Sequence, residues 1–309
     1  MERVEENYGT YVPAMTLKPL EQVVEKRTPP TVAAPNFIND VAAGRVELPT
    51  IPHIVQRLLV VLRDPDSDNR EISETLLKDP ILSAKVLRLA NSALFGGRRS
   101  VATVHAAIAI VGMQAVNRLV MACGVSSAFS EVPGVDLASF WRDALRTAKA
   151  AQSLAPHCGA DPHEAYLCGL LHGTGHLILC QTYPEIASFV FAGFEPVRGA
   201  ELAAIEVESF GIDHASVTAL WIDTIGFPQT VIDAVRQSPR PYADSDNALD
   251  RSLRAACTIA AAIAGEVEAA TLWSALPPSI CEQFGGTAEE PGAAFTDLYH
   301  DLTQEEPTM

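Results

Sequence analysis

Two histidines four residues apart are the residues of this chain best suited to chemistry. His172 and His176 belong to the run Gly169-Leu170-Leu171-His172-Gly173-Thr174-Gly175-His176, and on an unbroken helix they would share one face. Such a pair can bind zinc, but Gly173 replaces the glutamate of the H-E-x-x-H motif. Gly173 and Gly175 also weaken a helix. These residues alone favour a structural role over a metal role.

The other motifs with known chemistry are less specific. His214 follows Asp213, where we expect the first turn of a helix, and a single histidine in that position is usually structural. The acidic run 64–68 begins like an EF-hand calcium loop, but Asn69 replaces the required glycine and Thr75 the required glutamate. The chain has no Gly-Lys pair for a phosphate-binding loop and no G-x-S-x-G nucleophile motif. The residues alone therefore identify no catalytic site.

Composition indicates a helical, acidic protein. Hydrophobic residues make up 48% of the 309 residues and aromatic residues only 6%, which favours close-packed helices over sheets. The net charge of −16 argues against direct nucleic-acid binding, because phosphates are bound by Lys and Arg. From Ala255 onwards the chain has nine acidic residues and no Lys or Arg. That end is either a solvated face, which is the favoured reading, or a surface for a basic partner.

The sequence predicts a cytoplasmic protein without a membrane span. Residues 1–30 lack the apolar core of a signal peptide. The apolar stretch Val101–Val125 is interrupted by polar residues and does not fit a transmembrane helix. None of the six cysteines forms a C-x-x-C pair, and most lie in apolar helical patterns, so we expect them to pack as small hydrophobic residues in a reducing compartment.

Helix signals divide the chain into two helical halves. Residues 1–36 form a proline-containing extension, and a turn near Val132–Val135 separates an N-terminal helical subdomain, 37–131, from a second one, 132–265. Residues 266–309 form an acidic, Gly-rich segment, in which a last helix is expected near 295–302. No strand alternation and no internal repeat is found, so the predicted fold is all-α with two helical subdomains.

Several aspartates in the sequence indicate where helices begin. Three aspartates are typical N-caps: Asp79, which precedes Pro80; Asp136; and Asp161, which precedes Pro162. The helix after Asp79 is predicted to run to about Phe95 and to end at Gly96-Gly97. Asn91 and Ser92 are poor residues for the middle of that helix, because their side chains compete for backbone hydrogen bonds. They predict a polar contact to a neighbouring loop.

Taken together and in order, these motifs resemble the HDOD family, the HD-related output domain of bacterial signalling proteins. The matches cover roughly residues 37–240. They are Leu48-Pro49-x-Ile51-Pro52, Asp79-Pro80-x-Leu82, Leu87-Arg88-Leu89-Ala90-Asn91-Ser92-Ala93-x-Phe95-Gly96, Ala107–Gly112, Phe140-Trp141-Arg142, Gly169-Leu170-Leu171-His172 and Phe210-Gly211-Ile212-Asp213-His214-Ala215.

The resemblance implies a two-part all-α fold whose C-terminal half is similar to the HD phosphohydrolases. The chain keeps His172 and His214 at the family's histidine positions, but Gly173 stands where the His-Asp doublet has its aspartate. Asp143 stands where the Phe-Trp-Arg motif commonly continues with histidine. We therefore expect no catalytic residue and no metal, and treat four residues as remnants of a metal site: His172, His214, Asp143 and His176. The family-motif residues expected to serve interaction are Leu89, Ala90, Asn91, Ser92, Phe95, Gly96 and Trp141.

The expected function is that of a non-enzymatic regulatory protein that acts through protein–protein contact. The resemblance implies partners bound in trans, from sensor, response-regulator or cyclic-dinucleotide machinery, and no cofactor. One alternative is a regulatory module that binds a nucleotide or metal in the degenerate HD pocket. A metal-dependent phosphohydrolase is the least favoured reading, because a carboxylate ligand is missing.

Overall fold

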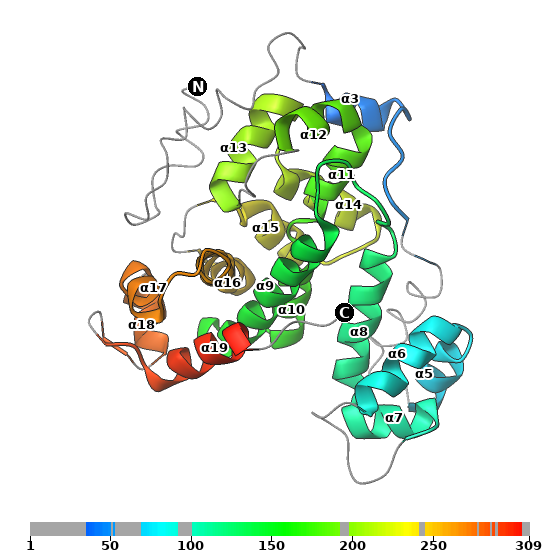
Figure 1. Ribbon diagram of the computed structural model, residues 1–309, viewed down its shortest axis with the longest axis vertical. Helices are drawn as coiled ribbons and strands as arrows, with labels where there is room; N and C mark the ends of the chain where they lie inside the picture. Colours follow the sequence, from blue (N-terminus) through cyan, green and yellow to red (C-terminus); the bar gives the residue numbers. More distant parts are fainter. Residues whose placement is uncertain are drawn as a thin grey trace. The chain divides into compact units, whose positions relative to one another are not determined.

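The computed structural model describes residues 35–50, 52, 69–91, 101–191, 198–240, 245–276, 278–284, 286–287 and 290–304. All regular elements within these ranges are helices, so the predicted all-α class is confirmed (Figure 1). Internal contacts divide the chain into a larger unit, Met1–Leu48 with Glu131–Thr308, and a smaller unit, Pro49–Ser130. The smaller unit lacks residues 37–48, which the expected boundary had included.

The smaller unit has four described helices. They are α5 (Asn69–Leu76), α6 (Pro80–Ala90), α7 (Val104–Val111) and α8 (Met113–Ser126). Helix α7 packs on α5, α6 and α8. Asp79 caps α6 as predicted, because its side chain accepts hydrogen bonds from the backbone N–H groups of Ile81 and Leu82.

Helix α6 ends five residues earlier than the sequence predicted, at Ala90 instead of Phe95. Asn91 is its C-terminal cap: its Nδ2 donates to the carbonyl oxygens of Leu87 (2.9 Å) and Val101 (2.8 Å). Its Oδ1 accepts from the Val101 N–H at 2.7 Å. The polar contact to a neighbouring loop, which the sequence predicted for this position, is therefore present.

Of the five remaining family-motif residues of the smaller unit, the structure describes two. Leu89 is half-buried and Ala90 is fully buried in the core of the smaller unit. Ser92, Phe95 and Gly96 lie outside the described residues.

The larger unit is organised along the long helix α9 (Leu137–Cys158), which α10 (Pro162–Leu171) and α16 (Ala248–Ala264) accompany closely (Figure 1). The predicted caps are confirmed, because Asp136 and Asp161 each accept two backbone N–H groups. Gly169 allows α10 to approach α9: a Cβ atom there would lie 2.6 Å from the Ala148 Cα. This close contact fixes the end of α10, and with it the position of His172.

Five more helices complete the region around His172 and His214. They are α11 (Thr174–Thr182), α12 (Pro184–Phe191), α13 (Gly199–Phe210), α14 (His214–Thr224) and α15 (Gln229–Gln237). Helix α14 packs between α11 and α15. The short helix α3 (Phe37–Ala42) belongs to the same unit, because the Tyr183 hydroxyl donates to Asp40 Oδ2 at 2.7 Å.

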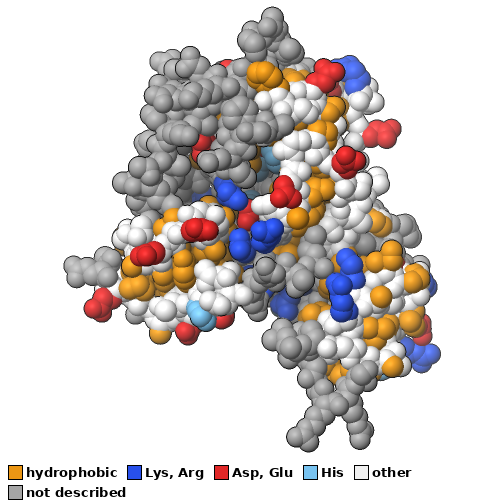
Figure 2. Space-filling view, in the orientation of Figure 1, with side chains coloured by type: hydrophobic (Ala, Val, Ile, Leu, Met, Phe, Trp, Pro, Cys, Tyr) orange, Lys and Arg blue, Asp and Glu red, His pale blue; other side chains and the backbone are white. Residues whose placement is uncertain are grey.

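The C-terminal segment has an apolar core of its own. It contains α17 (Ala269–Ala275), α18 (Pro278–Gln283) and α19 (Ala293–Gln304), so the last predicted helix is present. The rings of Trp273, Phe284 and Phe295 pack together, and the Phe284 ring lies 5.0 Å from that of His157 on α9. The segment is thus part of the larger unit. Among the described residues of this segment, the exposed acidic ones are Glu266, Glu268, Glu282, Glu290, Asp297 and Asp301. Acidic side chains appear in Figure 2 on the surface where Figure 1 draws α17 to α19.

All six cysteines are free, and all but the half-buried Cys257 are buried. No helix in the described part of the chain is by itself long and apolar enough to cross a membrane. Helices α7 and α8, which meet at a bend of 110°, satisfy the length and composition requirement only when taken together.

Candidate functional site

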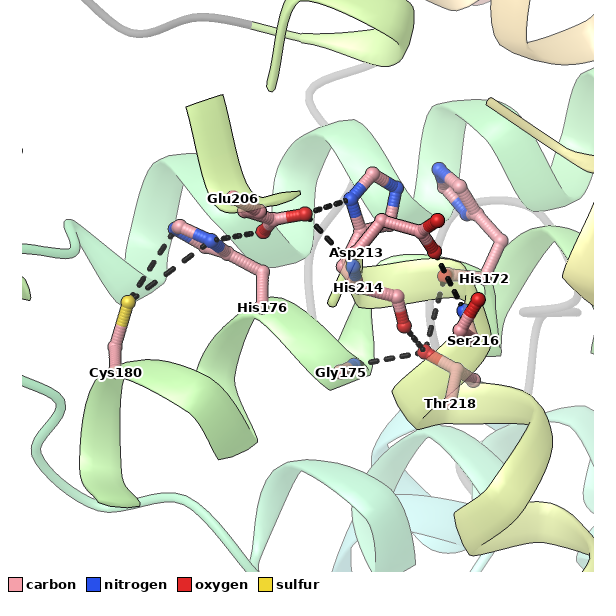
Figure 3. A network of polar contacts seen from close by, with 9 residues as sticks. All are labelled: His172, Gly175, His176, Cys180, Glu206, Asp213, His214, Ser216 and Thr218. Atoms are coloured by element: carbon pink, nitrogen blue, oxygen red, sulfur yellow. Dashed lines mark hydrogen bonds and ion pairs between the residues drawn. The ribbon is translucent and has the colours of Figure 1, made fainter. Parts of the chain in front are cut away.

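The helix that would align His172 with His176 is interrupted between them. Helix α10 ends at Leu171, His172 is its C-terminal cap, and Gly173 precedes the first turn of α11. The unbroken helix on which the two histidines would share one face is therefore absent. The two rings instead take part in different sets of contacts (Figure 3).

His172 is held by its own helix end. Its Nδ1 atom lies 2.7 Å from the carbonyl oxygen of Gly169, so the ring donates its proton there and leaves the Nε2 lone pair free. Burial, together with the neighbouring charge of His214, lowers the pKa of His172 to about 4, although the Gly169 bond and Asp143 oppose this change. The ring is therefore neutral at physiological pH.

A buried glutamate, Glu206 on α13, joins the two other histidines. Its Oε1 lies 2.8 Å from His176 Nδ1, and its Oε2 lies 2.6 Å from His214 Nδ1 and 2.7 Å from the His214 backbone nitrogen (Figure 3). The side chain has no exposed surface. Burial disfavours the charged carboxylate, but the charge of His214 and the hydrogen bonds from both rings outweigh it and lower the pKa of Glu206 to about 2.

The contacts of His176 are internal to the helical core. Its ring meets that of Phe191 edge-on, with centroids 4.8 Å apart, and the Cys180 Sγ lies 3.7 Å from Nε2. Burial opposes its protonation, but Cys180 and Glu206 together raise the pKa of His176 to about 10. His176 therefore links α11 to α13 and is not directed at the same point as His172.

A threonine and a glycine bring α11 and α14 together. The Gly175 N–H donates to Thr218 Oγ1 at 2.8 Å. The Thr218 hydroxyl in turn donates to the carbonyl oxygen of His214 at 2.8 Å, and the carbonyl oxygen of His172 lies 3.1 Å from the same hydroxyl. A Cβ atom on Gly175 would lie 2.0 Å from the His214 carbonyl oxygen. Only glycine allows this approach, which places His172 and His214 next to each other (Figure 3).

Asp143, on α9, has arginine partners. Arg198 donates through both Nε (2.9 Å) and Nη2 (2.7 Å) to Asp143 Oδ2, and Arg146 Nη1 lies 3.4 Å from Oδ1. The nearby Trp141 is a core residue, only 4% exposed, and packs edge-on against Phe140. The Phe140 ring also covers Gly173: a Cβ atom there would lie 3.3 Å from the nearest ring carbon.

This arrangement does not fit a catalytic metal ion. Among the described residues, no three side chains of His, Cys, Asp or Glu are placed so that they could hold one. Gly173 offers no ligand, the Asp143 carboxylate is neutralised by Arg198, and Glu206 is occupied by two histidines. A hydrolytic metal site needs convergent ligands and an open position for water.

Two residues of this region were missed by the sequence analysis. Glu206 lies on the same buried helical face as Ala203 and Phe210, three residues before it and four after. A single acid on an apolar face was a signal that could have identified it. Arg198 gave no such signal, because it lies 55 residues from Asp143 and only the tertiary fold pairs them.

The all-α fold, with His172 and His214 held next to each other, defines a helical protein of the HD-related class. The family model of the HDOD domain matches residues 48–241, and the chain belongs to the HDOD family. A curated protein of Treponema pallidum (strain Nichols), described as uncharacterised, is 24% identical over 197 residues. That match covers 63% of this chain and only 38% of the Treponema protein.

Solved structures with the same fold cover most of the chain. A protein of Shewanella amazonensis SB2B, described as a phosphohydrolase, is 29% identical, with a TM-score of 0.65 over 86% of this chain and 93% of its own. A protein of Marinobacter aquaeolei VT8, described as a signal transduction protein, is 22% identical, with a TM-score of 0.63 over 92% of this chain and 62% of its own. An HDOD domain protein of unknown function from Geobacter sulfurreducens is 19% identical, with a TM-score of 0.62 over 93% and 99%.

Proposed function

We propose that this chain is a non-catalytic regulatory HDOD protein that acts through contacts with other proteins. The observation that carries the proposal is the pairing of Asp143 with Arg198, at a site where Gly173 has no side chain to offer. One candidate ligand is neutralised by a guanidinium group, and the other position has no side chain. The remaining imidazoles do not form a catalytic metal site.

A hydrolysis assay tests the absence of catalysis. The purified protein would be incubated with cyclic di-GMP and with a panel of phosphate monoesters, in the presence of Mg²⁺, Mn²⁺ or Fe²⁺. We expect turnover no higher than that of a His172→Ala variant. Metal-stimulated turnover that disappears in His172→Ala would contradict the proposal.

A signalling role is supported by family membership and by the Marinobacter protein, which is described as a signal transduction protein. We propose that the partners belong to sensor, response-regulator or cyclic-dinucleotide machinery and bind in trans. The exposed acidic residues of the C-terminal segment form a candidate surface, because residues 255–309 include no Lys or Arg. Truncation is a poor test of this surface, since α18 and α19 pack on α9.

A second candidate function is metal-dependent phosphohydrolysis. The observation that favours it is the 29% identity to the Shewanella protein described as a phosphohydrolase. It would require a ligand set other than the His-Asp doublet, and the hydrolysis assay decides between the two functions. A nucleotide bound without turnover, the remaining alternative, would appear as thermal stabilisation, because a ligand of the folded state raises its stability.

A further inference from the structure

The Asp143–Arg198 pair connects two distant parts of the larger unit. Asp143 lies on α9, whereas Arg198 directly precedes α13 and has an extended backbone. Two N–H groups of the guanidinium meet the single oxygen Oδ2, and both side chains are largely shielded, with 33% of Arg198 and 25% of Asp143 exposed. This geometry differs from that of a surface pair between neighbouring residues of one helix, which contributes little.

The charge of Asp143 acts on His172, and His172 and its neighbour His214 still have features of a cation site. His172 gives its Nδ1 proton to the Gly169 carbonyl, and His214 gives its Nδ1 proton to Glu206. Outer hydrogen bonds of this kind orient the histidine ligands of metal sites. Burial opposes the protonation of His214, but Glu206 raises its pKa, so an ion bound there would displace the Nε2 proton of that ring. The two rings lie side by side in Figure 3. What the site lacks, compared with a metal site, is a carboxylate that is free to bind the ion.

We propose that the Arg198 guanidinium is the permanent cation of this site and compensates the Asp143 carboxylate in place of a metal ion. Arginine suits this role, because its guanidinium remains charged at all physiological pH values and presents its donors in a rigid plane. It also holds the start of α13 against α9 without depending on metal supply. This inference rests on the proposed function only in that the natural protein holds no metal.

Removal of the Arg198 guanidinium group tests this inference. In Arg198→Ala, Asp143 loses the closer of its two arginine partners and keeps only the 3.4 Å contact with Arg146, so we expect its carboxylate to turn towards His172 and His214. We expect this variant to be less stable than the wild type without metal. After incubation with Zn²⁺ or Mn²⁺ and removal of free ion, it should retain about one equivalent and unfold at a higher temperature. Elemental analysis and thermal unfolding with and without chelator measure both effects.

Two controls separate this role from that of an ordinary ion pair. In Asp143→Asn combined with Arg198→Ala, the carboxylate is absent, and we expect neither metal retention nor metal-dependent stabilisation. Arg236→Ala breaks an exposed pair with Asp233 on α15 (3.4 Å), and this variant should behave like the wild type. Should Arg198→Ala fail to fold, Arg198→Gln removes the charge with less loss of volume and is expected to gain metal in the same way.

The outcomes distinguish this inference from the proposed function. An Arg198 variant that stays metal-free at millimolar Zn²⁺ and Mn²⁺ would overturn the inference and leave a simple ion pair, without affecting the proposed function. Metal gained equally by Arg198→Ala and by the double variant would also overturn it, because the ion would not depend on Asp143. Stoichiometric metal in the wild type would overturn the inference, and only metal-stimulated turnover in addition would overturn the proposed function.

Discussion

Glu206 accepts two hydrogen bonds from His214 on one oxygen: Oε2 lies 2.7 Å from the backbone nitrogen and 2.6 Å from ring Nδ1. The backbone group is at the first residue of α14, where an anion is favoured by the helix dipole. The other oxygen, Oε1, binds His176 on α11. One buried carboxylate thus joins three helices, and its role is structural.

Replacing Glu206 with glutamine should strongly destabilise the larger unit. The amide has nearly the same shape, but it has no charge, and its NH₂ group cannot accept from a ring N–H. Breaking a buried ion pair by removing one partner costs about 3–5 kcal/mol. Urea denaturation of Glu206→Gln would measure the change in the free energy of unfolding.

The matched control is Glu208→Gln, two residues away on the same helix. Glu208 is exposed, so its substitution is expected to change stability by less than about 0.5 kcal/mol. Equal effects of the two substitutions would show that the Glu206 network contributes no special stability.

Stability should be greatest near pH 6.5. Glu206, whose pKa is lowered from 4.5 to about 2, stabilises the fold above pH 4.5, and this contribution is lost as the pH falls towards 2. His172, whose pKa is lowered from 6.5 to about 4, loses its contribution as the pH falls from 6.5 to 4. His176, whose pKa is raised from 6.5 to about 10, contributes fully below pH 6.5 and loses this contribution as the pH rises towards 10.

Urea midpoints across this pH range would test the assignment. Cys180 and Glu206 both raise the pKa of His176, and Glu206→Gln removes one of these two partners, so the alkaline decline should become shallower than in the wild type. Parallel curves for the two proteins above pH 6.5 would mean that Glu206 does not control the protonation of His176.

A single methyl group on Gly175 should disrupt the contact between α11 and α14. In Gly175→Ala, Cβ would lie 2.0 Å from the His214 carbonyl oxygen and 2.8 Å from the Thr218 nitrogen. Backbone atoms cannot move aside as a flexible side chain can, and overpacking of a core costs about 1–3 kcal/mol or more. Thermal unfolding should therefore show a clear loss for Gly175→Ala.

Gly265→Ala is the appropriate comparison for this substitution. The nearest neighbour of a Cβ atom at Gly265 is the Ala261 carbonyl oxygen at 3.5 Å, an ordinary contact. We expect this variant to unfold close to the wild-type temperature. A loss as large as that of Gly175→Ala would show that added volume at the α11–α14 contact is not the cause.

In the smaller unit, Asn91→Ala should loosen the connection between α6 and Val101. The substitution removes the three side-chain hydrogen bonds to Leu87 and Val101. Each such bond contributes about 0.5–1.5 kcal/mol, and less where water can replace it, as at this exposed site. Hydrogen exchange at the Val101 amide should accelerate, whereas the buried Val86 amide in α6 should keep its rate; unchanged exchange at Val101 would contradict this role.

If the acidic C-terminal segment binds a basic partner, loss of its charge should weaken capture without unfolding the protein. Asp297 and Asp301 are exposed, lie one turn apart on α19 and so share a face. The double variant Asp297→Asn, Asp301→Asn should recover less partner, and more salt should reduce capture by the wild type. Glu185→Gln with Glu208→Gln, two exposed acids elsewhere in the larger unit, is the control, and equal capture by both double variants would exclude this surface.

The sequence by itself determined the helical class, the family and many helix starts. The caps at Asp79, Asp136 and Asp161 could be predicted because a capping side chain reaches backbone groups only two or three residues away. The sequence also shows directly that Gly173 stands where the His-Asp doublet of the family has its carboxylate. The end of α6 at Ala90 could not be predicted from the sequence, because it depends on the hydrogen bonds between Asn91 and Val101, ten residues further along the chain.

Tertiary structure alone decided what the polar residues near His172 do. His176 meets Glu206 across 30 residues of chain, and Asp143 meets Arg198 across 55. Contacts at such separations leave no periodic pattern in the sequence, because they depend on how whole helices pack. The closest of those packing contacts, at Gly175, requires the absence of a side chain. The residue types show that chemistry was conceivable, whereas only the tertiary structure pairs His176 and His214 with Glu206, and Asp143 with Arg198.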